Sequence, residues 1–240
     1  MIYKIYPLLV FFMLSFAKDS KSTPEIKKAT VKTFAKAEKL TVDLKIESIY
    51  NTLHSNNFSL PELKTFTEAL KGFYLLKERG VIQKDILTLI DFSLSSNTKR
   101  LWVIDLTTNT ILYNSLVAHG RNTGDEFAST FSNSNSSFKS SLGFYSTGEI
   151  YRGKHGASLR LDGLERGVND NARERAVVMH GADYVSESFI RSNKRLGRSL
   201  GCPAIPLELT DEIIETIKNK SCLYIYHPSR SFAMEEKLIS

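Results

Sequence analysis

In the first part of the chain, hydrophobic residues recur at helical spacing. Between residues 46 and 53, apolar side chains are three or four positions apart, which predicts a short amphipathic helix. A longer helix is predicted over 59–80, where Ser59 and Glu62 form a capping box and Gly80 follows as a stop signal. The apolar segment 86–92 is predicted to continue this helical region.

From residue 100 onward the hydrophobic pattern changes to alternation, the period of strands. Residues 100–120 predict two strands around a turn at 107–109, and the Ser/Asn-rich stretch 121–141 predicts a polar loop. Short predicted strands follow, with one short helix before the last of them: strands 142–148, 158–164, 175–181 and 222–228, and helix 208–220. We therefore expect a mainly β domain over 98–230, preceded by a helical N-terminal region over 46–95.

The first residues have the layout of a secretory signal peptide. Lys4 precedes the apolar run 5–17, which ends in the small-x-small sequence Ser15-Phe16-Ala17. A run of this length is too short to span a bilayer. We expect cleavage after residue 17, a flexible or loosely helical leader over 18–45, and an exported protein of the periplasm or cell envelope without stable membrane insertion.

The composition is that of a folded protein, with 42% hydrophobic and 24% charged residues among 240. The formal charge of +6 suits an acidic polymer or surface, but the basic residues form no long block, so nucleic acid is not an expected partner. The glycines form no phosphate-binding loop, and no cofactor is expected. The oligomeric state is left open.

The two cysteines lie in different sequence contexts. Cys222 opens an apolar strand, which suits a small buried side chain. Cys202 follows Gly201 in a turn, and Arg198 and Ser199 lie close to it, so we expect positive charge and exposed N–H groups to lower the pKa of its thiol. A disulfide between the two cysteines remains an alternative, because exported proteins commonly pair them.

A nucleophilic cysteine needs a base, and His180 is the best candidate among the five histidines. It closes an apolar strand and is followed at once by Gly181, at a sheet edge. A zinc interpretation rests on His-Gly pairs at 119, 155 and 180 and on His180 with Asp183, but neither an HExxH motif nor a Cys/His cluster accompanies them.

With His180-Gly181 and the sequence Ser199-Leu200-Gly201-Cys202 in hand, the chain resembles the L,D-transpeptidases, exported bacterial cysteine enzymes that remodel peptidoglycan. Their signature is a strand ending in His-Gly and, about twenty residues later, Ser/Thr-His-Gly-Cys; here His180 and Cys202 are 22 positions apart. The segment 141–145 resembles another element of that family, and the hairpin at 103–113 resembles its opening hairpin. The resemblance covers about residues 60–230 and is strongest to the murein L,D-transpeptidase catalytic domain branch.

This resemblance implies a β-sandwich or barrel and a two-step reaction on peptidoglycan stem peptides. Cys202 would attack the diaminopimelate carbonyl of a donor tetrapeptide, with His180 as the base. Backbone N–H groups of Gly201 and Cys202 would form the oxyanion hole. Further residues are expected to orient the histidine or bind substrate: Gly181 and Ser199 for the former, Arg198 and Tyr184 for the latter.

Two positions depart from the family pattern. Leu200 stands where the family usually has a second histidine, and Ala204 replaces the customary Asn or Arg two places after the cysteine. Three alternatives therefore stay open beside the transpeptidase: an L,D-carboxypeptidase that uses water as acceptor, a catalytically silent wall-binding module on the same fold, and a disulfide-stabilised structural domain.

Overall fold

A computed structural model describes residues 41–153 and 156–230 of the chain. Two compact units are distinguished, Met1–Val42 and Asp43–Ser240, and the fold below is that of the second. The predicted signal peptide, most of the predicted leader, and His155 lie outside the described residues. No helix within the described ranges is both long and apolar enough to cross a membrane.

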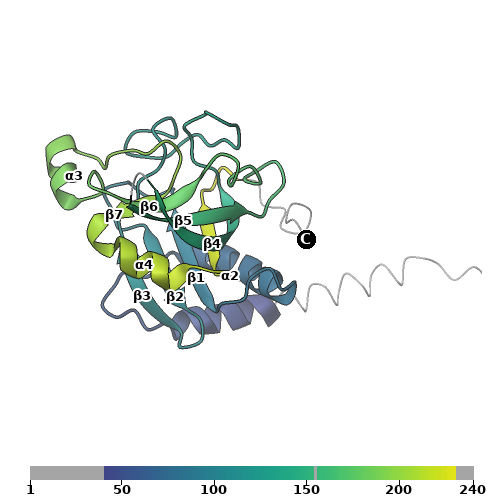
Figure 1. Cartoon of the computed structure of the whole chain (residues 1–240). Helices are drawn as coiled ribbons and strands as arrows, with labels where there is room; N and C mark the ends of the chain where they lie inside the picture. The colour runs from purple at the N-terminus through teal and green to yellow at the C-terminus, as the bar shows by residue number, and fades with distance from the viewer. Residues whose placement is uncertain (1–40, 154–155, 231–240) are drawn as a thin grey trace, which may run out of the picture. The chain divides into compact units, whose positions relative to one another are not determined.

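The fold is built on one mixed sheet of eight strands in the order β3-β2-β1-β8-β4-β5-β6-β7 (Figure 1). The strands are β1 (Ile86–Asp91), β2 (Leu101–Asp105), β3 (Thr110–Ser115), β4 (Gly143–Gly153), β5 (Gly156–Gly163), β6 (Val178–Ala182), β7 (Ala204–Pro206) and β8 (Cys222–Tyr226). β1 and β8 pair in parallel, as do β6 and β7, and the other neighbours are antiparallel.

The ends of this sheet approach each other. Ala118, three residues beyond β3, forms an antiparallel bridge with Ala204 at the start of β7. The Ala118 N–H donates to the Ala204 carbonyl at 2.8 Å, and the reverse bond measures 3.3 Å. The sheet is therefore nearly closed and barrel-like, and the expectation of a mainly β domain with helices before it is confirmed.

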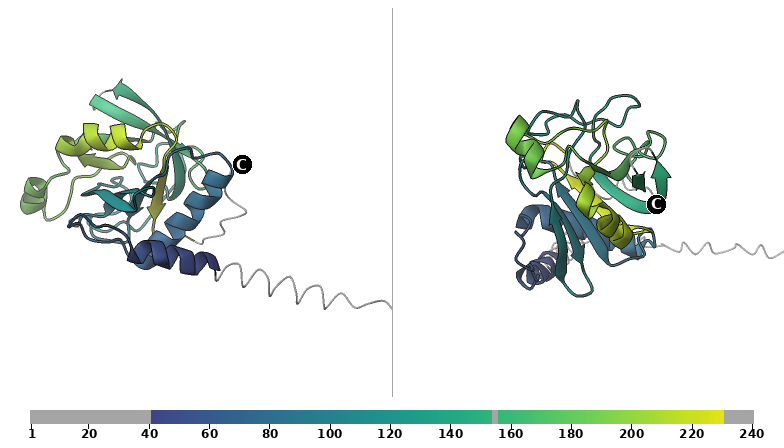
Figure 2. Two further views of the ribbon diagram at one scale, coloured as in Figure 1. Left: turned by 90° about the horizontal axis from the view of Figure 1, so that it is seen from below. Right: turned by 60° about the vertical axis from the view of Figure 1, so that its left-hand side comes forward.

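Helices pack on both faces of the sheet (Figure 2). A helix over 41–51 and α2 (Leu63–Glu78) share one core cluster, whereas α4 (Thr210–Ile217) belongs to a second. The other helices are short, α3 (Glu187–Asn193) and the 3₁₀ turn η1 (Leu207–Leu209). Along β8, Cys222 and Tyr224 face the first cluster, and Leu223 and Ile225 face the second.

The prediction that 86–92 continues a helix is wrong, because this segment is β1. Leu87 and Leu89 enter the first core cluster and Ile90 the second, so both faces of the strand are buried. A strand buried on both faces is apolar throughout and lacks the alternation that identifies a strand. Since β1 pairs with β2 and with β8, the sheet extends across the expected boundary at residues 95–98.

The longer N-terminal helix is confirmed, but it begins later than predicted. It starts at Leu63, its N-cap Glu62 makes no side-chain capping bond, and Ser59 Oγ instead donates to Asn114 Oδ1 at 3.1 Å. Gly80 follows the helix with φ of +71°, as a C-terminal glycine should. Residues 41–45, which were expected in the leader, belong to the helix over 41–51.

The hairpin, the short helix α4 and the strands β4, β5, β6 and β8 overlap their predicted segments, whereas α3 and β7 were not predicted. The hairpin is β2 and β3 around residues 106–109, and the loop 121–141 contains no strand among its described residues. α2 meets the sheet closely at Gly72, where an added Cβ would lie 2.0 Å from the Phe144 ring. Only glycine permits this approach of the helix to β4.

Candidate active site

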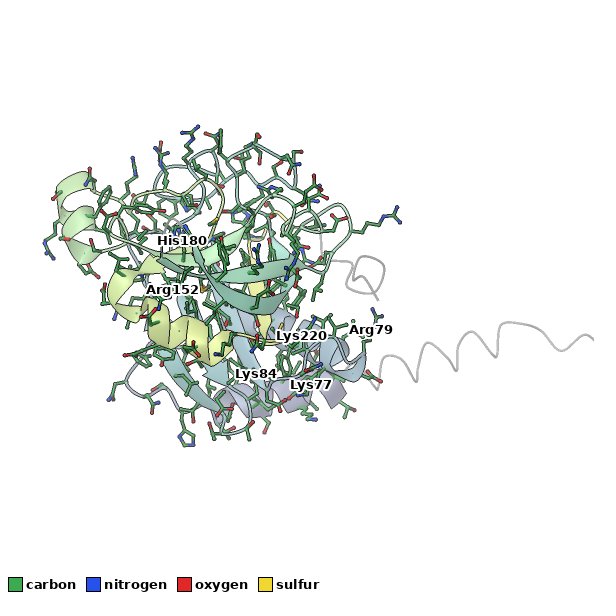
Figure 3. The ribbon with its side chains drawn as sticks, viewed as in Figure 1. Lys77, Arg79, Lys84, Arg152, His180 and Lys220 are labelled. Atoms are coloured by element: carbon green, nitrogen blue, oxygen red, sulfur yellow. The ribbon has the colours of Figure 1, made fainter. Side chains whose placement is uncertain are left out.

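The parallel pairing of β6 with β7 brings the two predicted catalytic residues together. His180 on β6 is opposite Ala204 on β7, and Cys202 precedes Ala204 by two residues. Cys202 is therefore beside Val178, whose N–H donates to the Cys202 sulphur at 3.5 Å. Two residues 22 positions apart in sequence thus lie on adjacent chain segments, two positions apart in register (His180 is labelled in Figure 3).

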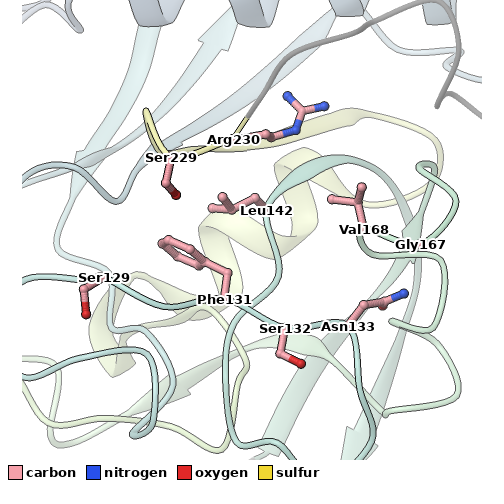
Figure 4. A pocket seen from close by; sticks show the side chains of 9 residues that line it. All are labelled: Ser129, Phe131, Ser132, Asn133, Leu142, Gly167, Val168, Ser229 and Arg230. Atoms are coloured by element: carbon pink, nitrogen blue, oxygen red, sulfur yellow. The ribbon is translucent and has the colours of Figure 1, made fainter.

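His180 and Cys202 line one pocket of about 430 Å³, a volume typical of small-molecule sites. Its other lining residues come from β4, from the segment before β6 and from the loops after it: Tyr151, Arg175, Ala176, Val177, Val178, Tyr184, Arg198, Ser199 and Leu200. A separate pocket of about 350 Å³ near Phe131 and Arg230 has no cysteine or histidine in its lining (Figure 4).

The ring of His180 is buried and its tautomer is fixed. Nδ1 lies 2.9 Å from the Gly181 carbonyl oxygen, and a carbonyl only accepts, so Nδ1 carries the proton. In the neutral ring, Nε2 is then the basic nitrogen. The sequence-based expectation named this carbonyl as one of two candidates for the role. Gly181 is also required sterically, because a Cβ there would lie 2.2 Å from Thr210 Oγ1 of α4.

Cys202 is half-buried, and its sulphur donates to the Ala176 carbonyl at 3.8 Å. Burial raises the pKa of the thiol above its ordinary value, while the Val178 N–H and the charge of Arg175 act in the opposite direction. The prediction of a lowered thiol pKa is therefore wrong, because desolvation outweighs the favourable contacts. The neighbouring cation is Arg175, which no motif in the sequence indicated.

The backbone at Cys202 is held by the Ser199 hydroxyl. Ser199 Oγ accepts from the Gly201 N–H at 3.0 Å and donates to the Cys202 carbonyl at 2.6 Å. The Gly201 N–H is thus already used, contrary to its predicted role in an oxyanion hole. The Cys202 N–H, the other member of the predicted pair, lies against its own sulphur, where it lowers the thiol pKa.

The loop carrying the nucleophile rests on the segment that follows β3. The Ser199 N–H donates to the His119 carbonyl at 3.0 Å, and the Arg121 N–H donates to the Ser199 carbonyl at 2.8 Å. Gly120 is so close that a Cβ there would lie 2.9 Å from Gly201 Cα. Gly201 itself has φ of +127°, a conformation that favours glycine.

This supporting segment is anchored in the interior by a pair that the sequence did not reveal. Arg100, fully buried, donates through NH2 to His119 Nδ1 at 2.8 Å, and His119 Nε2 donates to the Gly124 carbonyl at 3.3 Å. Burial, reinforced by the Arg100 charge, lowers the pKa of His119 to about 4. Burial also lowers the pKa of Arg100 to about 9. The only sequence signal was the His-Gly pair at 119, which we had considered for zinc.

Two residues predicted to bind substrate also line the pocket. Arg198 NH1 donates to Asp125 Oδ1 at 2.6 Å and to the carbonyls of Arg121 and Gly124, so this nitrogen already holds a neighbouring loop. Burial raises the pKa of Tyr184 to about 12, with smaller contributions from Cys202 and Asp183.

The two departures from the family pattern occupy different environments. Leu200 is 61% exposed and lines the pocket, whereas Ala204 is fully buried. Ala204 belongs to a small apolar cluster with Ala118, Ala182 and Val185 among others. A long polar side chain at this position would be buried among apolar groups, at a cost of about 1–3 kcal/mol without a partner. The alanine therefore suits its place beside His180.

The alternative chemistries can be compared with this geometry. Both cysteines are free, and Cys222 is fully buried as its strand position predicted. The disulfide alternative is therefore not realised in the structure. Within the ranges that the structure describes, no group of three or more His, Cys, Asp or Glu side chains is placed to hold a metal ion.

The pocket in this nearly closed sheet holds a cysteine and a buried, oriented histidine, the two groups that thiol-dependent catalysis requires. Residues 59–226 match the L,D-transpeptidase catalytic domain family. This match spans most of the chain, and the protein belongs to that family. No curated protein matches the sequence.

Two solved structures are similar to parts of this fold. An L,D-transpeptidase from Mycobacterium smegmatis is 11% identical with a TM-score of 0.37, covering 60% of this chain and 59% of its own. The helical cell shape determining protein Pgp2 from Campylobacter jejuni is 12% identical with a TM-score of 0.38, covering 66% and 56%. The chain thus spans about three-fifths of the length of these proteins.

Proposed function

We propose that this protein is an exported cysteine acyltransferase that acts on peptidoglycan stem peptides as an L,D-transpeptidase. The observation that carries the proposal is the shared pocket of Cys202 and His180, in which the Gly181 carbonyl fixes the histidine tautomer. Membership of the L,D-transpeptidase family supports the substrate class. The resemblance of the site sequence to that of the family supports the assignment of the two roles.

The reaction begins with transfer of the Cys202 proton to His180 Nε2 as the sulphur attacks the diaminopimelate carbonyl of a donor tetrapeptide. Negative charge develops on the carbonyl oxygen, and the Cys202 N–H is the donor that we assign to it, an interaction typically worth about 3–4 kcal/mol. The protonated histidine then gives its proton to the departing D-alanine, leaving a thioester on Cys202. An amine of an acceptor stem attacks this thioester, returns the thiol and completes the new peptide bond.

The charge of the protein is consistent with an acidic wall polymer. The chain carries +6 at pH 7. Some of this charge gathers near the end of α2, where Lys77, Arg79, Lys84 and Lys220 are labelled in Figure 3. The Lys84 N–H donates to the Lys220 carbonyl, so residues far apart in sequence are adjacent here. Such a surface raises the local concentration of an anionic substrate.

The test is mass spectrometry of muropeptides with tetrapeptide stems after incubation with the full-length protein. We expect loss of D-alanine and formation of cross-linked dimers with the wild type, and neither product with Cys202→Ala or His180→Ala. Cys222→Ala is the matched control, because Cys222 is buried away from the pocket, and it should retain the activity.

Other outcomes separate the alternatives. Uncross-linked tripeptides as the sole product would identify an L,D-carboxypeptidase with water as acceptor. Binding to sacculi without any turnover by the folded wild type would identify a silent wall-binding module and contradict the proposal. Acyl-enzyme formation in Cys202→Ala would contradict the role of Cys202.

A further inference from the structure

Arg175 lies just before β6, and its guanidinium is hydrogen-bonded to the polar loop 132–141. Its NH1 donates to the Ser132 carbonyl at 2.9 Å and to Ser141 Oγ at 3.1 Å. Its NH2 donates to the Lys139 carbonyl at 2.7 Å and to Ser137 Oγ at 3.3 Å. One planar guanidinium therefore fixes four points of a segment that has no strand or helix of its own.

The same loop supports the backbone of the nucleophile. Ser140 Oγ donates to the Gly201 carbonyl at 3.0 Å and also accepts from the Gly120 N–H at 3.0 Å. The Lys139 carbonyl, which Arg175 holds, would lie 2.9 Å from a Cβ placed on Gly201. The position of Gly201, and with it that of Cys202, therefore depends on a loop that Arg175 ties down.

The charge of Arg175 is not neutralised by a carboxylate. All four of its hydrogen-bond acceptors are uncharged oxygens. None of the ion pairs found among residues 41–153 and 156–230 includes it. Arg198, the other arginine of the pocket, is paired with Asp125. Arg175 is half-buried and lines the pocket that contains Cys202, where screening by water is reduced.

We propose that Arg175 is a positioning residue for the nucleophile: it latches loop 132–141 beneath Gly201 and supplies the unpaired positive charge that stabilises the Cys202 thiolate. The inference rests on the proposed role of Cys202. The other titratable groups that line the pocket are His180, Tyr184, Tyr151 and Arg198. Arg175 makes no contact with the reacting atoms in this assignment and acts through the loop and through its field.

Alkylation of Cys202 by iodoacetamide tests the charge without any peptidoglycan. The rate below the thiol pKa is proportional to the fraction present as thiolate, and mass spectrometry of the Cys202 peptide distinguishes it from buried Cys222. We expect Arg175→Met to react about tenfold more slowly at pH 8, with its pH profile displaced upward by about one unit, because a nearby opposite charge shifts a pKa by at least this much.

Arg173→Met is the matched control. Arg173 is two residues away and makes ion pairs with Asp162 and Glu149, but it is absent from the lining of the pocket. This control should keep the wild-type alkylation profile. Equal profiles for folded Arg175→Met and Arg173→Met would overturn the electrostatic part of the proposal.

Arg175→Lys separates the effect of the charge from the effect of the hydrogen bonds to loop 132–141. It also provides a test if Arg175→Met does not fold. Lysine keeps the charge but cannot reproduce the planar fork of donors. We expect an alkylation profile close to that of the wild type, together with faster hydrogen exchange across residues 132–141. Unchanged hydrogen exchange across residues 132–141 would overturn the proposal that Arg175 anchors this loop. Because none of these measurements uses a cell-wall substrate, their failure is distinguishable from failure of the proposed function.

Discussion

The protonation state of the resting pair can be tested by replacing His180 with glutamine. Burial raises the pKa of Cys202 above its ordinary value of 9.0. Even at 9.0, a thiol at pH 7 is two pH units below its pKa, so only about one molecule in a hundred is ionised. Burial therefore favours a protonated Cys202 thiol at rest, and in the proposed mechanism its proton moves to His180 during the attack.

Alkylation and turnover, each measured in the wild type and in His180→Gln, test this protonation state. Wild-type alkylation by iodoacetamide should rise about tenfold per pH unit from pH 7 and still be rising at pH 9. His180→Gln should change this profile little, because in the proposed mechanism the histidine takes the proton only during the attack on substrate. Turnover of muropeptides should fall by about 10²–10⁴ in His180→Gln, the usual contribution of a general base.

A different result would refute the reasoning. If wild-type alkylation is already on a plateau at pH 7, and His180→Gln moves that plateau upward by several units, the resting state is a thiolate–imidazolium pair. In that case the pKa of the thiol is set by the histidine and not by burial. The matched control is Cys222→Ala, whose alkylation at Cys202 should follow the wild-type curve, since Cys222 lies outside the pocket.

Three further predictions concern the framework. Gly120→Ala places a carbon 2.9 Å from Gly201 Cα, and we expect at least about a tenfold loss of muropeptide turnover as the nucleophile loop is displaced; wild-type turnover would contradict this contact. Gly72→Ala overpacks α2 against Phe144 and should lower the unfolding free energy by about 1–3 kcal/mol in urea titrations; an unchanged midpoint would refute the close packing. The pKa of His119 is lowered to about 4, so the unfolded chain binds the extra proton first and stability should fall as pH drops from 6.5 to 4, by up to about 3 kcal/mol. His119→Gln should lack this component in denaturation measured across that range.

Whether a strand could be predicted from the sequence depends on whether one or both of its faces are buried. The hairpin of β2 and β3 was predicted because a turn sequence separates two apolar segments, although β3 alternates half-buried and buried positions only over its first three residues. β1 was taken for a helix because five of its six residues are fully buried. Its partner β8 lies more than a hundred residues away in sequence, and local patterns do not contain that pairing.

The residues of the candidate site also differ in whether the local sequence marks them. Cys202 and His180 were predicted to share a site because glycines mark the ends of their strand and loop, and the spacing of 22 resembles the family pattern; the structure places both in one pocket. Arg175 was missed because its partners are carbonyls and hydroxyls of the loop 132–141, which any polar sequence offers. The use of the Gly201 N–H by Ser199 was missed for a related reason, since it depends on a side-chain rotamer within a turn.

The site combines a half-buried thiol with an unpaired cation. Burial of the thiol and the charge of the cation act on different steps of the proposed reaction. Burial favours a protonated Cys202 at rest, so the thiol carries no charge before the attack. A thiol of higher pKa gives fewer thiolates, but each one is a stronger nucleophile. Arg175 opposes burial only once the sulphur is ionised, because a cation has little interaction with a neutral thiol. We infer that this arrangement confines the reactive thiolate to the moment when His180 takes the proton.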